Sequence, residues 1–349
     1  MFILTTIGLL ISTVFLSFGL SLGGSFLAPR EINSTRGGMV LGANEYQPDN
    51  IIQGGDFNEA ITKVFEDVKF LSLSQIPQFN QIEQELPQIQ EKDELPTRII
   101  NFDLAAENGV ILDSQSNNLF FSKRPDRAWP LASITKLFTA YTFLDHNPGW
   151  ETIYEIKTED RREGGKIYLF TGDKVKIKDL FYFSLVGSDN TATAALANST
   201  GMTEEEFIVK INNKIEEFGL KNTKIVDVAG LKEGNVSTAR EIAQFADVAL
   251  EVPEINRAVL TEKYEFTTEQ GRKKVIYSTD KLLNNFSEQD ISILGGKTGH
   301  IDASGYNLVS KFMDQEGRTI TTVILGADSE ASRFILTQEL VELYYNNRP

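Results

Sequence analysis

Hydrophobic and polar positions divide the chain into three parts, and the first part is a long apolar run. Phe2 to Leu27 carries no charged residue and is longer than the ~20 residues that cross a bilayer as a helix. No lysine or arginine precedes the run, whereas Arg30 and Arg36 follow it, which opposes the usual orientation of a secretory segment. We expect residues 1–28 to be an uncleaved membrane anchor, with a cleaved signal segment as the alternative.

The second part, residues 29–96, is polar and lacks the periodicity of a packed domain. It is rich in Gly, Asn, Gln, Glu and Pro, a composition typical of linkers. Between Phe57 and Phe70, however, apolar residues recur at the spacing of an amphipathic helix. We therefore predict a mostly low-order linker that contains one short helix, docked on its own domain.

The third part, residues 97–349, has the patterns of a folded domain, beginning with strands and continuing with helices. Residues 109–113 and 119–123 are apolar segments separated by a polar turn, which predicts a β-hairpin. A helix is predicted over residues 131–145, and residues 178–250 are predicted to be mostly helical.

One helix within this middle region has clear start and stop signals. Thr203 and Glu206 have the spacing of a capping box, in which each side chain satisfies the other residue's backbone N–H. Gly219 has the conformational freedom that commonly ends a helix. These signals predict a helix from Thr203 to Gly219.

Strand patterns return near the end of the chain. The segments at 292–299, 305–313 and 318–327 are rich in β-branched and apolar residues, and the polar residues 314–317 predict a hairpin turn between the last two. Residues 332–345 predict a closing helix. Strands at both ends with helices between them indicate an α/β sandwich, built on an antiparallel sheet that pairs its first and last strands.

Composition removes several classes of function. Asp and Glu outnumber Lys and Arg by 49 to 34, for a net charge of -15, which disfavours binding to nucleic acid. Cysteine is absent, so the chain has neither a thiolate nucleophile nor a Cys-based metal site. With His146 and His300 as the only histidines, a histidine-rich zinc site is hard to build. We expect neither a metal nor a cofactor.

Three short motifs occur in one order along the folded part. They are S-x-x-K at Ser133 to Lys136, S-D-N at Ser188 to Asn190, and K-T-G at Lys297 to Gly299. A second S-x-x-K, at Ser278 to Lys281, has no S-x-N between it and the K-T-G. A single match of this kind is weak, but the ordered set points to a common site.

Elementary chemistry gives the first motif a purpose. A serine hydroxyl needs a base to act as a nucleophile at neutral pH, and a helix N-terminus stabilises developing negative charge. Three residues after Ser133, Lys136 lies on the same helical face. Its amine can accept a proton only if its pKa falls, through burial or through a nearby cation such as Lys297.

The ordered set resembles the signature of penicillin-binding proteins and serine β-lactamases. The segments ASITKLFTAYTFLDHNPG, NVSTARE and GGKTGHIDASGYNLV are similar to the D-alanyl-D-alanine carboxypeptidase branch, and the similarity runs from about Ile100 to the C-terminus. The resemblance implies a serine β-lactamase/transpeptidase-like sandwich, with an antiparallel sheet of about five strands, flanking helices and a helical subdomain.

The resemblance also implies roles for the motif residues. Ser133 would be the nucleophile and Lys136 its base, while Ser188 would relay a proton to the leaving group and Asn190 would bind Lys136 and substrate. The substrate-binding strand would comprise Lys297, Thr298, Gly299 and His300. Lys297 and Thr298 would anchor a carboxylate, and the backbone N–H groups of Ser133 and His300 would form the oxyanion hole. The side chain of His300 is expected at the rim of the site.

The expected function is that of a peptidoglycan D-Ala-D-Ala carboxypeptidase acting through a serine acyl-enzyme and inhibited covalently by β-lactams. A β-lactamase is the first alternative, although no Glu between the S-D-N and the K-T-G has an Asn four residues later, as a class A enzyme would. A D,D-endopeptidase and an inactive wall-binding or β-lactam-sensing domain also remain. The substrate implies an extracytoplasmic location at the cell membrane, with residues 29–96 as a tether and a cleaved, secreted form as the alternative.

Overall fold

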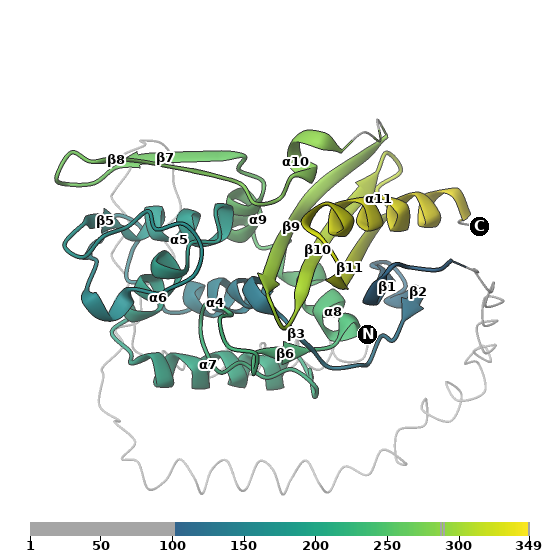
Figure 1. Cartoon of the computed structure of the whole chain (residues 1–349), viewed down its shortest axis with the longest axis horizontal. Coiled ribbons are helices and arrows are strands. Elements are labelled where there is room, and N and C mark those ends of the chain that lie inside the picture. The colour runs from purple at the N-terminus through teal and green to yellow at the C-terminus, as the bar shows by residue number, and fades with distance from the viewer. Residues whose placement is uncertain (1–101, 287, 289, 348–349) are drawn as a thin grey trace, which may run out of the picture. The chain divides into compact units, whose positions relative to one another are not determined.

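The computed structural model describes residues 102–286, 288 and 290–347 of the chain (Figure 1). The expected anchor at residues 1–28, the linker at 29–96 and the short helix within that linker lie outside the described residues. Within the described ranges, no helix combines the length and the apolar character that crossing a membrane requires.

A five-stranded antiparallel sheet forms the centre of the domain, in the order β2-β1-β11-β10-β9. Its strands are β1 (Ala106–Asp113), β2 (Asn118–Lys123), β9 (Ile291–Ile301), β10 (Gly305–Asp314) and β11 (Thr319–Ala327). The first long strand pairs with the last, with Val110 opposite Val323. The predicted pairing of the first and last strands is therefore confirmed, as are both hairpin turns.

Helices cover both faces of this sheet, so successive residues of β1, β10 and β11, which point to alternate faces, are nearly all buried. Helix α8 (Ala239–Ala249) contributes Ile242 and Phe245 to the core that contains Val110 and Val323. Helix α11 (Glu330–Asn347) lies across the opposite face (Figure 1). Its apolar side chains pack with those of β1, β10 and β11 in a second core. The α/β sandwich expected from the sequence is confirmed.

Most of the remaining helices form the helical part of the domain. They are α4 (Thr135–Leu144), α5 (Ile177–Val186), α6 (Asn190–Asn198), α7 (Glu204–Glu217) and α9 (Pro253–Val259). The short α10 (Leu282–Asn285) instead contributes Leu282 to the second core. The predicted capping box of α7 is present, because Thr203 and Glu206 exchange side-chain to backbone hydrogen bonds of 3.2 and 2.9 Å. Phe138 of α4 stacks on Phe245 of α8, with ring centroids 3.8 Å apart, and joins this part to the sheet.

Several short elements were not predicted. Three small two-stranded sheets pair β3 (Trp129–Pro130) with β6 (Val236–Ser237), β4 (Ile153–Glu155) with β5 (Lys174–Lys176), and β7 (Lys263–Thr267) with β8 (Lys273–Tyr277). The helix predicted from residue 131 instead begins at Thr135, after the 3₁₀ turn η2 (Ala132–Ile134). The left-handed backbone angle of Ala132, φ 49°, interrupts the helical conformation at this point.

Candidate active site

A cleft of about 640 Å³ opens between strand β9 and the helical part of the domain. Residues from all three motifs line it: Ser133, Ser188, Asn190, Thr298, Gly299 and His300. The two motif lysines, Lys136 and Lys297, lie beneath its surface and are 0% and 1% exposed. The structure therefore brings together every site residue that the sequence singled out.

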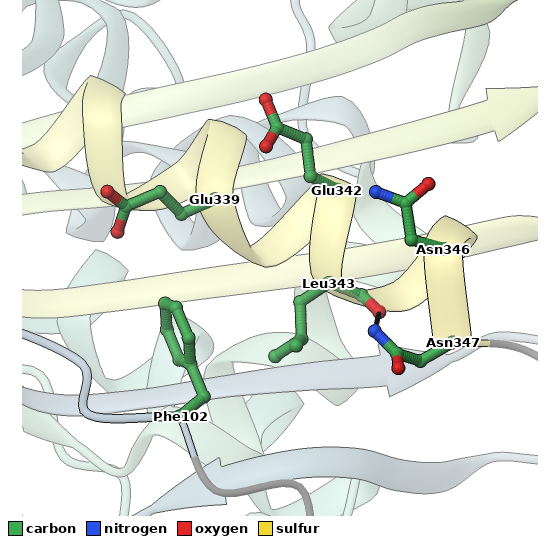
Figure 2. Close-up of a pocket in the computed structure, with 6 residues that line it drawn as sticks. All are labelled: Phe102, Glu339, Glu342, Leu343, Asn346 and Asn347. Atoms are coloured by element: carbon green, nitrogen blue, oxygen red, sulfur yellow. Dashed lines mark hydrogen bonds between the residues drawn. The ribbon is translucent and has the colours of Figure 1, made fainter.

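A second hollow lies on α11, far from the three motifs in the sequence. Figure 2 shows its lining residues, Phe102, Glu339, Glu342, Leu343, Asn346 and Asn347. None of them belongs to the ordered set. Among the described residues, no group of three or more His, Cys, Asp or Glu side chains is placed to hold a metal ion. The three motifs therefore mark the first cleft as the candidate site.

Ser133 lies in the 3₁₀ turn η2, immediately before α4. Ala132 has a left-handed backbone angle, φ 49°, which is costly for a residue with a side chain. Gly230 and Gly299 approach this turn closely. A Cβ at Gly230 would come within 1.9 Å of the Ala132 carbonyl oxygen, and one at Gly299 within 3.2 Å of the Ser133 nitrogen. Two glycines distant in sequence thus allow the backbone to close around Ser133.

Lys136 is held by three oxygen atoms. Its Nζ lies 2.7 Å from Ser133 Oγ, 2.8 Å from Asn190 Oδ1 and 2.6 Å from the carbonyl oxygen of Ala229. The amide and carbonyl oxygens can only accept, so they take two N–H bonds of the amine in either protonation state. The third position of the nitrogen faces Ser133, where a neutral amine presents its lone pair to the hydroxyl.

Burial makes that neutral state accessible. It lowers the pKa of Lys136 from 10.5 to about 7, although the charges of Asp189 and Asp227 oppose the shift. Of the two causes allowed by the sequence, a nearby cation or burial, burial is the one that lowers this pKa. The pKa of Lys297 is also lowered, to well below 10.5. Burial is the main cause, followed by the positive charges of Lys136 and Arg333.

The S-D-N motif lies at the turn between α5 and α6, and each of its residues has a distinct contact. Ser188 has a left-handed φ of 59°, and its Oγ accepts a hydrogen bond from Lys297 Nζ at 2.9 Å. Asp189 is the N-cap of α6, and burial raises the pKa of its carboxyl to about 6. Asn190 donates from Nδ2 to the Gly164 carbonyl at 3.0 Å, which orients its Oδ1 towards Lys136.

The K-T-G motif lies on β9, the edge strand of the sheet. Lys297 is paired with Val309 and Thr298 with Leu308, and the two partners belong to the cores on opposite faces of the sheet. Thr298 nevertheless lines the cleft, because it is at the sheet edge, and its Oγ1 lies 2.7 Å from Thr279 Oγ1. His300 is exposed at the rim of the cleft.

The second S-x-x-K has a different environment. Ser278 Oγ accepts a hydrogen bond from the backbone N–H of Asp280 at 3.1 Å. The Nζ of Lys281 lies 2.8 Å from Glu330, and the side chain of Lys281 is 55% exposed. This lysine is neither buried nor in hydrogen-bond contact with its own serine, so the arrangement lacks the features that distinguish Lys136.

Sequence reasoning missed two polar residues that position the Ala229 carbonyl. The Asp227 carboxylate accepts hydrogen bonds from four successive backbone N–H groups, those of residues 229–232, at 2.7 to 3.1 Å. Asn235 accepts from the N–H of Val226 and Asp227 and donates to Thr135 Oγ1 at 3.0 Å. Polar residues flanking Gly230 within an apolar stretch were the available signal.

Arg333, on α11, was also missed, because a lysine or arginine in an amphipathic helix usually faces solvent. Here its side chain is 6% exposed and lines the cleft. Its Nη1 donates to the Gly299 carbonyl at 3.3 Å, and its guanidinium lies 5.6 Å from the Tyr306 ring centre. Burial lowers the pKa of Arg333. Arg333 thus adds a second buried cation, after Lys297, to the side of the cleft that carries Thr298.

Solved structures of similar proteins share this fold. A Streptomyces DD-transpeptidase superimposes with a TM-score of 0.64 at 24% identity, covering 70% of this chain and 98% of that one. A penicillin-binding protein of Listeria monocytogenes, in a cefotaxime-bound form, matches with a TM-score of 0.61 at 25% identity, covering 70% and 98%. The predicted serine β-lactamase/transpeptidase-like fold is therefore confirmed.

Proteins of similar sequence and a family model show to which family the chain belongs. A D-alanyl-D-alanine endopeptidase of Haemophilus influenzae is 30% identical over 245 residues, which are 68% of this chain and 82% of the relative. The D-alanyl-D-alanine carboxypeptidase DacA of the same species is 26% identical over 254 residues, 70% of this chain and 63% of the relative. The family model described as D-alanyl-D-alanine carboxypeptidase matches residues 92–329. The chain therefore belongs to the D-alanyl-D-alanine carboxypeptidase family of peptidases.

Proposed function

We propose that this protein is a peptidoglycan D-Ala-D-Ala carboxypeptidase that acts through an acyl-enzyme on Ser133. The observation that carries the proposal is the set of three contacts at Lys136 Nζ, which leaves the lone pair of a neutral amine facing the Ser133 hydroxyl. The lowered pKa of Lys136, about 7, supports a base that works at neutral pH.

In the acylation step, Lys136 accepts the proton of Ser133 while Oγ attacks the carbonyl carbon of the penultimate D-alanine. The backbone N–H groups of Ser133 and His300 stabilise the oxyanion of the tetrahedral intermediate. The proton that Lys136 took from Ser133 passes through Ser188 to the leaving nitrogen, so that Lys136 becomes neutral again, the C–N bond breaks, and D-alanine departs. In deacylation, water gives a proton to the neutral Lys136 while its oxygen attacks the ester carbon. The C–Oγ bond then breaks, and Lys136 returns the proton to Ser133 Oγ.

The terminal carboxylate of the substrate binds on the β9 side of the cleft in this proposal. Thr298 offers a hydroxyl there, and Lys297 and Arg333 lie buried behind it. A carboxylate gains most from such cations where water is excluded. Penicillin carries an equivalent carboxylate next to a strained amide, so it should acylate Ser133 at the same site.

A D,D-endopeptidase is the second candidate, and one observation favours it. The Haemophilus influenzae relative that matches over 82% of its length is described as a D-alanyl-D-alanine endopeptidase. Both activities use the same nucleophile and differ in the size of the leaving group. A β-lactamase would need rapid hydrolysis of the penicilloyl ester, and an inactive sensing domain would not require the intact contacts at Lys136.

One experiment separates these candidates. The protein is incubated with fluorescent penicillin, with a peptide ending in D-Ala-D-Ala and with a cross-linked stem-peptide dimer. A lasting adduct on Ser133 and release of D-alanine are expected, with slower cleavage of the dimer. Faster cleavage of the dimer than of the D-Ala-D-Ala peptide would identify an endopeptidase. An adduct that is lost within seconds would identify a β-lactamase. A lasting adduct without release of either product would identify a sensing domain.

We also propose that residues 1–28 anchor the protein in the cell membrane, with residues 97–349 outside the cytoplasm as the catalytic domain. The uncharged apolar run from Phe2 to Leu27 supports the anchor, and the peptidoglycan substrate supports the location. Protease added to intact spheroplasts should degrade the domain. Protection until the cells are lysed would contradict this location.

A further inference from the structure

An ion pair at the rim of the cleft joins two segments that lie 49 residues apart. Lys281 Nζ lies 2.8 Å from Glu330 Oε2, and both residues line the cleft. Lys281 belongs to the second S-x-x-K, which the proposed chemistry leaves unused, and Glu330 is the first residue of α11. The two side chains are 55% and 48% exposed. Exposed ion pairs of this kind contribute little to the stability of a fold.

The other oxygen of Glu330 faces the buried guanidinium behind Thr298. Glu330 Oε1 lies 3.5 Å from Arg333 Nη2, a longer contact than the one to Lys281. Among the described residues, Arg333 Nε has no hydrogen-bond partner, so the guanidinium is only partly satisfied. Glu330 is thus a carboxylate of the protein itself, shared unequally between a close exposed lysine and a more distant buried arginine.

A carboxylate close to a guanidinium reduces the attraction of that guanidinium for another anion. We propose that Lys281 and Glu330 are positioning residues that tune the affinity of Arg333 for the substrate's terminal carboxylate. Lys281 holds Glu330 away from Arg333 and so leaves the guanidinium available. The inference rests on the proposed function, because it assumes a substrate carboxylate on the β9 side of the cleft.

The arrangement predicts opposite effects for the two side chains. Glu330→Gln removes the competing charge and should tighten binding of a carboxylate. Lys281→Ala releases Glu330 towards Arg333 and should weaken that binding, whereas Lys281→Arg should preserve it. Because Lys281 acts through Glu330, Lys281→Ala should have little effect once Glu330 is glutamine. If Lys281 attracts the ligand directly, its loss weakens binding equally in both backgrounds.

The test measures the dissociation constant of a peptide ending in D-Ala-D-Ala by calorimetry, in the full chain carrying Ser133→Ala, so that no turnover is needed. Changes of about two- to fivefold are expected in each direction, the range of an exposed ion pair. The same peptide with a terminal carboxamide should show no difference between variants. Glu151→Gln and Lys176→Ala, which remove an exposed ion pair of 2.6 Å whose residues do not line the cleft, are the matched controls.

Three outcomes would overturn the inference. They are weaker or unchanged binding in Glu330→Gln, equal effects of Lys281→Ala in both backgrounds, and failure of the unaltered cleft to bind the carboxylate peptide. The proposed function is tested separately, by penicillin labelling and D-alanine release with the protein that retains Ser133. A labelled, active enzyme with unaltered affinities would thus refute the tuning role alone.

Discussion

The Nζ of Lys136 lies 2.6 Å from the carbonyl oxygen of Ala229, a residue 93 positions later in the chain. This carbonyl and the Asn190 amide oxygen set the direction in which the lysine can meet Ser133. The position of the carbonyl depends on Asp227 and Asn235, which bind the surrounding backbone. The geometry of the proposed base therefore depends on a loop outside the three motifs as well as on Asn190.

Asn235→Ala should reduce acylation by penicillin and destabilise the protein by about 1–3 kcal/mol, because it leaves buried backbone N–H groups and Thr135 Oγ1 without their partner. The measurement combines the second-order rate constant of acylation with denaturant unfolding. A destabilised protein that is acylated at the wild-type rate would contradict the positioning role.

The matched control for this prediction is Asn212→Ala. Asn212 also exchanges hydrogen bonds with the backbone, accepting from Ile225 N at 3.1 Å and donating to the Ile208 carbonyl at 2.9 Å, but it does not line the cleft. We expect a comparable loss of stability with little change in the acylation rate.

Ser133→Ala should abolish covalent labelling by fluorescent penicillin and lower peptide hydrolysis by roughly a thousandfold or more, because the proposed nucleophile is removed. The variant should still fold, because the substitution removes only a hydroxyl at the surface of the cleft. Ser278→Ala, in the second S-x-x-K, is the control and should still be labelled. Mass spectrometry of the adduct identifies the site, and labelling of Ser133→Ala would exclude Ser133 as the nucleophile.

Acylation should accelerate as the pH rises through about 7, because the proposed base must lose its proton and burial lowers the pKa of Lys136 to that value. Loss of the charge on Lys297, whose pKa burial also lowers, should oppose this acceleration, because that charge binds the carboxylate. The pH profile of penicillin acylation measures both effects. A rate that does not change across pH 7 would argue against Lys136 as the base.

The pH dependence of the free energy of unfolding should reveal the lowered pKa of Lys136 independently of activity. Between about 7 and 10.5, Lys136 binds a proton in the unfolded chain but not in the folded one, so its contribution to the free energy of unfolding rises with pH in that window. Below about pH 7, Lys136 is charged in the folded protein as well, and the cost of burying that charge has its full value. Lys136→Met should therefore show a smaller rise in unfolding free energy over that pH range, measured by denaturant titration. An equal rise in both proteins would mean that Lys136 keeps an ordinary pKa.

Local patterns in the sequence determined most of the elements. The β-branched and apolar runs of β1, β10 and β11 and the capping box of α7 depend on neighbours within a few positions, so they could be read directly. The order of the three motifs likewise indicated one site. The start of α4 could not be read, because the left-handed backbone of Ala132 lies where Gly230 and Gly299 approach it, a packing that no local pattern contains.

The order of the motifs distinguished the two S-x-x-K patterns in the sequence, but only the tertiary structure gave their lysines different physical environments. Ser133 with Lys136 and Ser278 with Lys281 are both S-x-x-K in the sequence. Folding buries Lys136 completely, 2.7 Å from its serine, whereas it leaves Lys281 half exposed beside Glu330. The pKa of a lysine depends on its distance from water and on charges brought close by the fold. Those distances are set by packing among residues far apart in the chain, which a four-residue motif cannot encode.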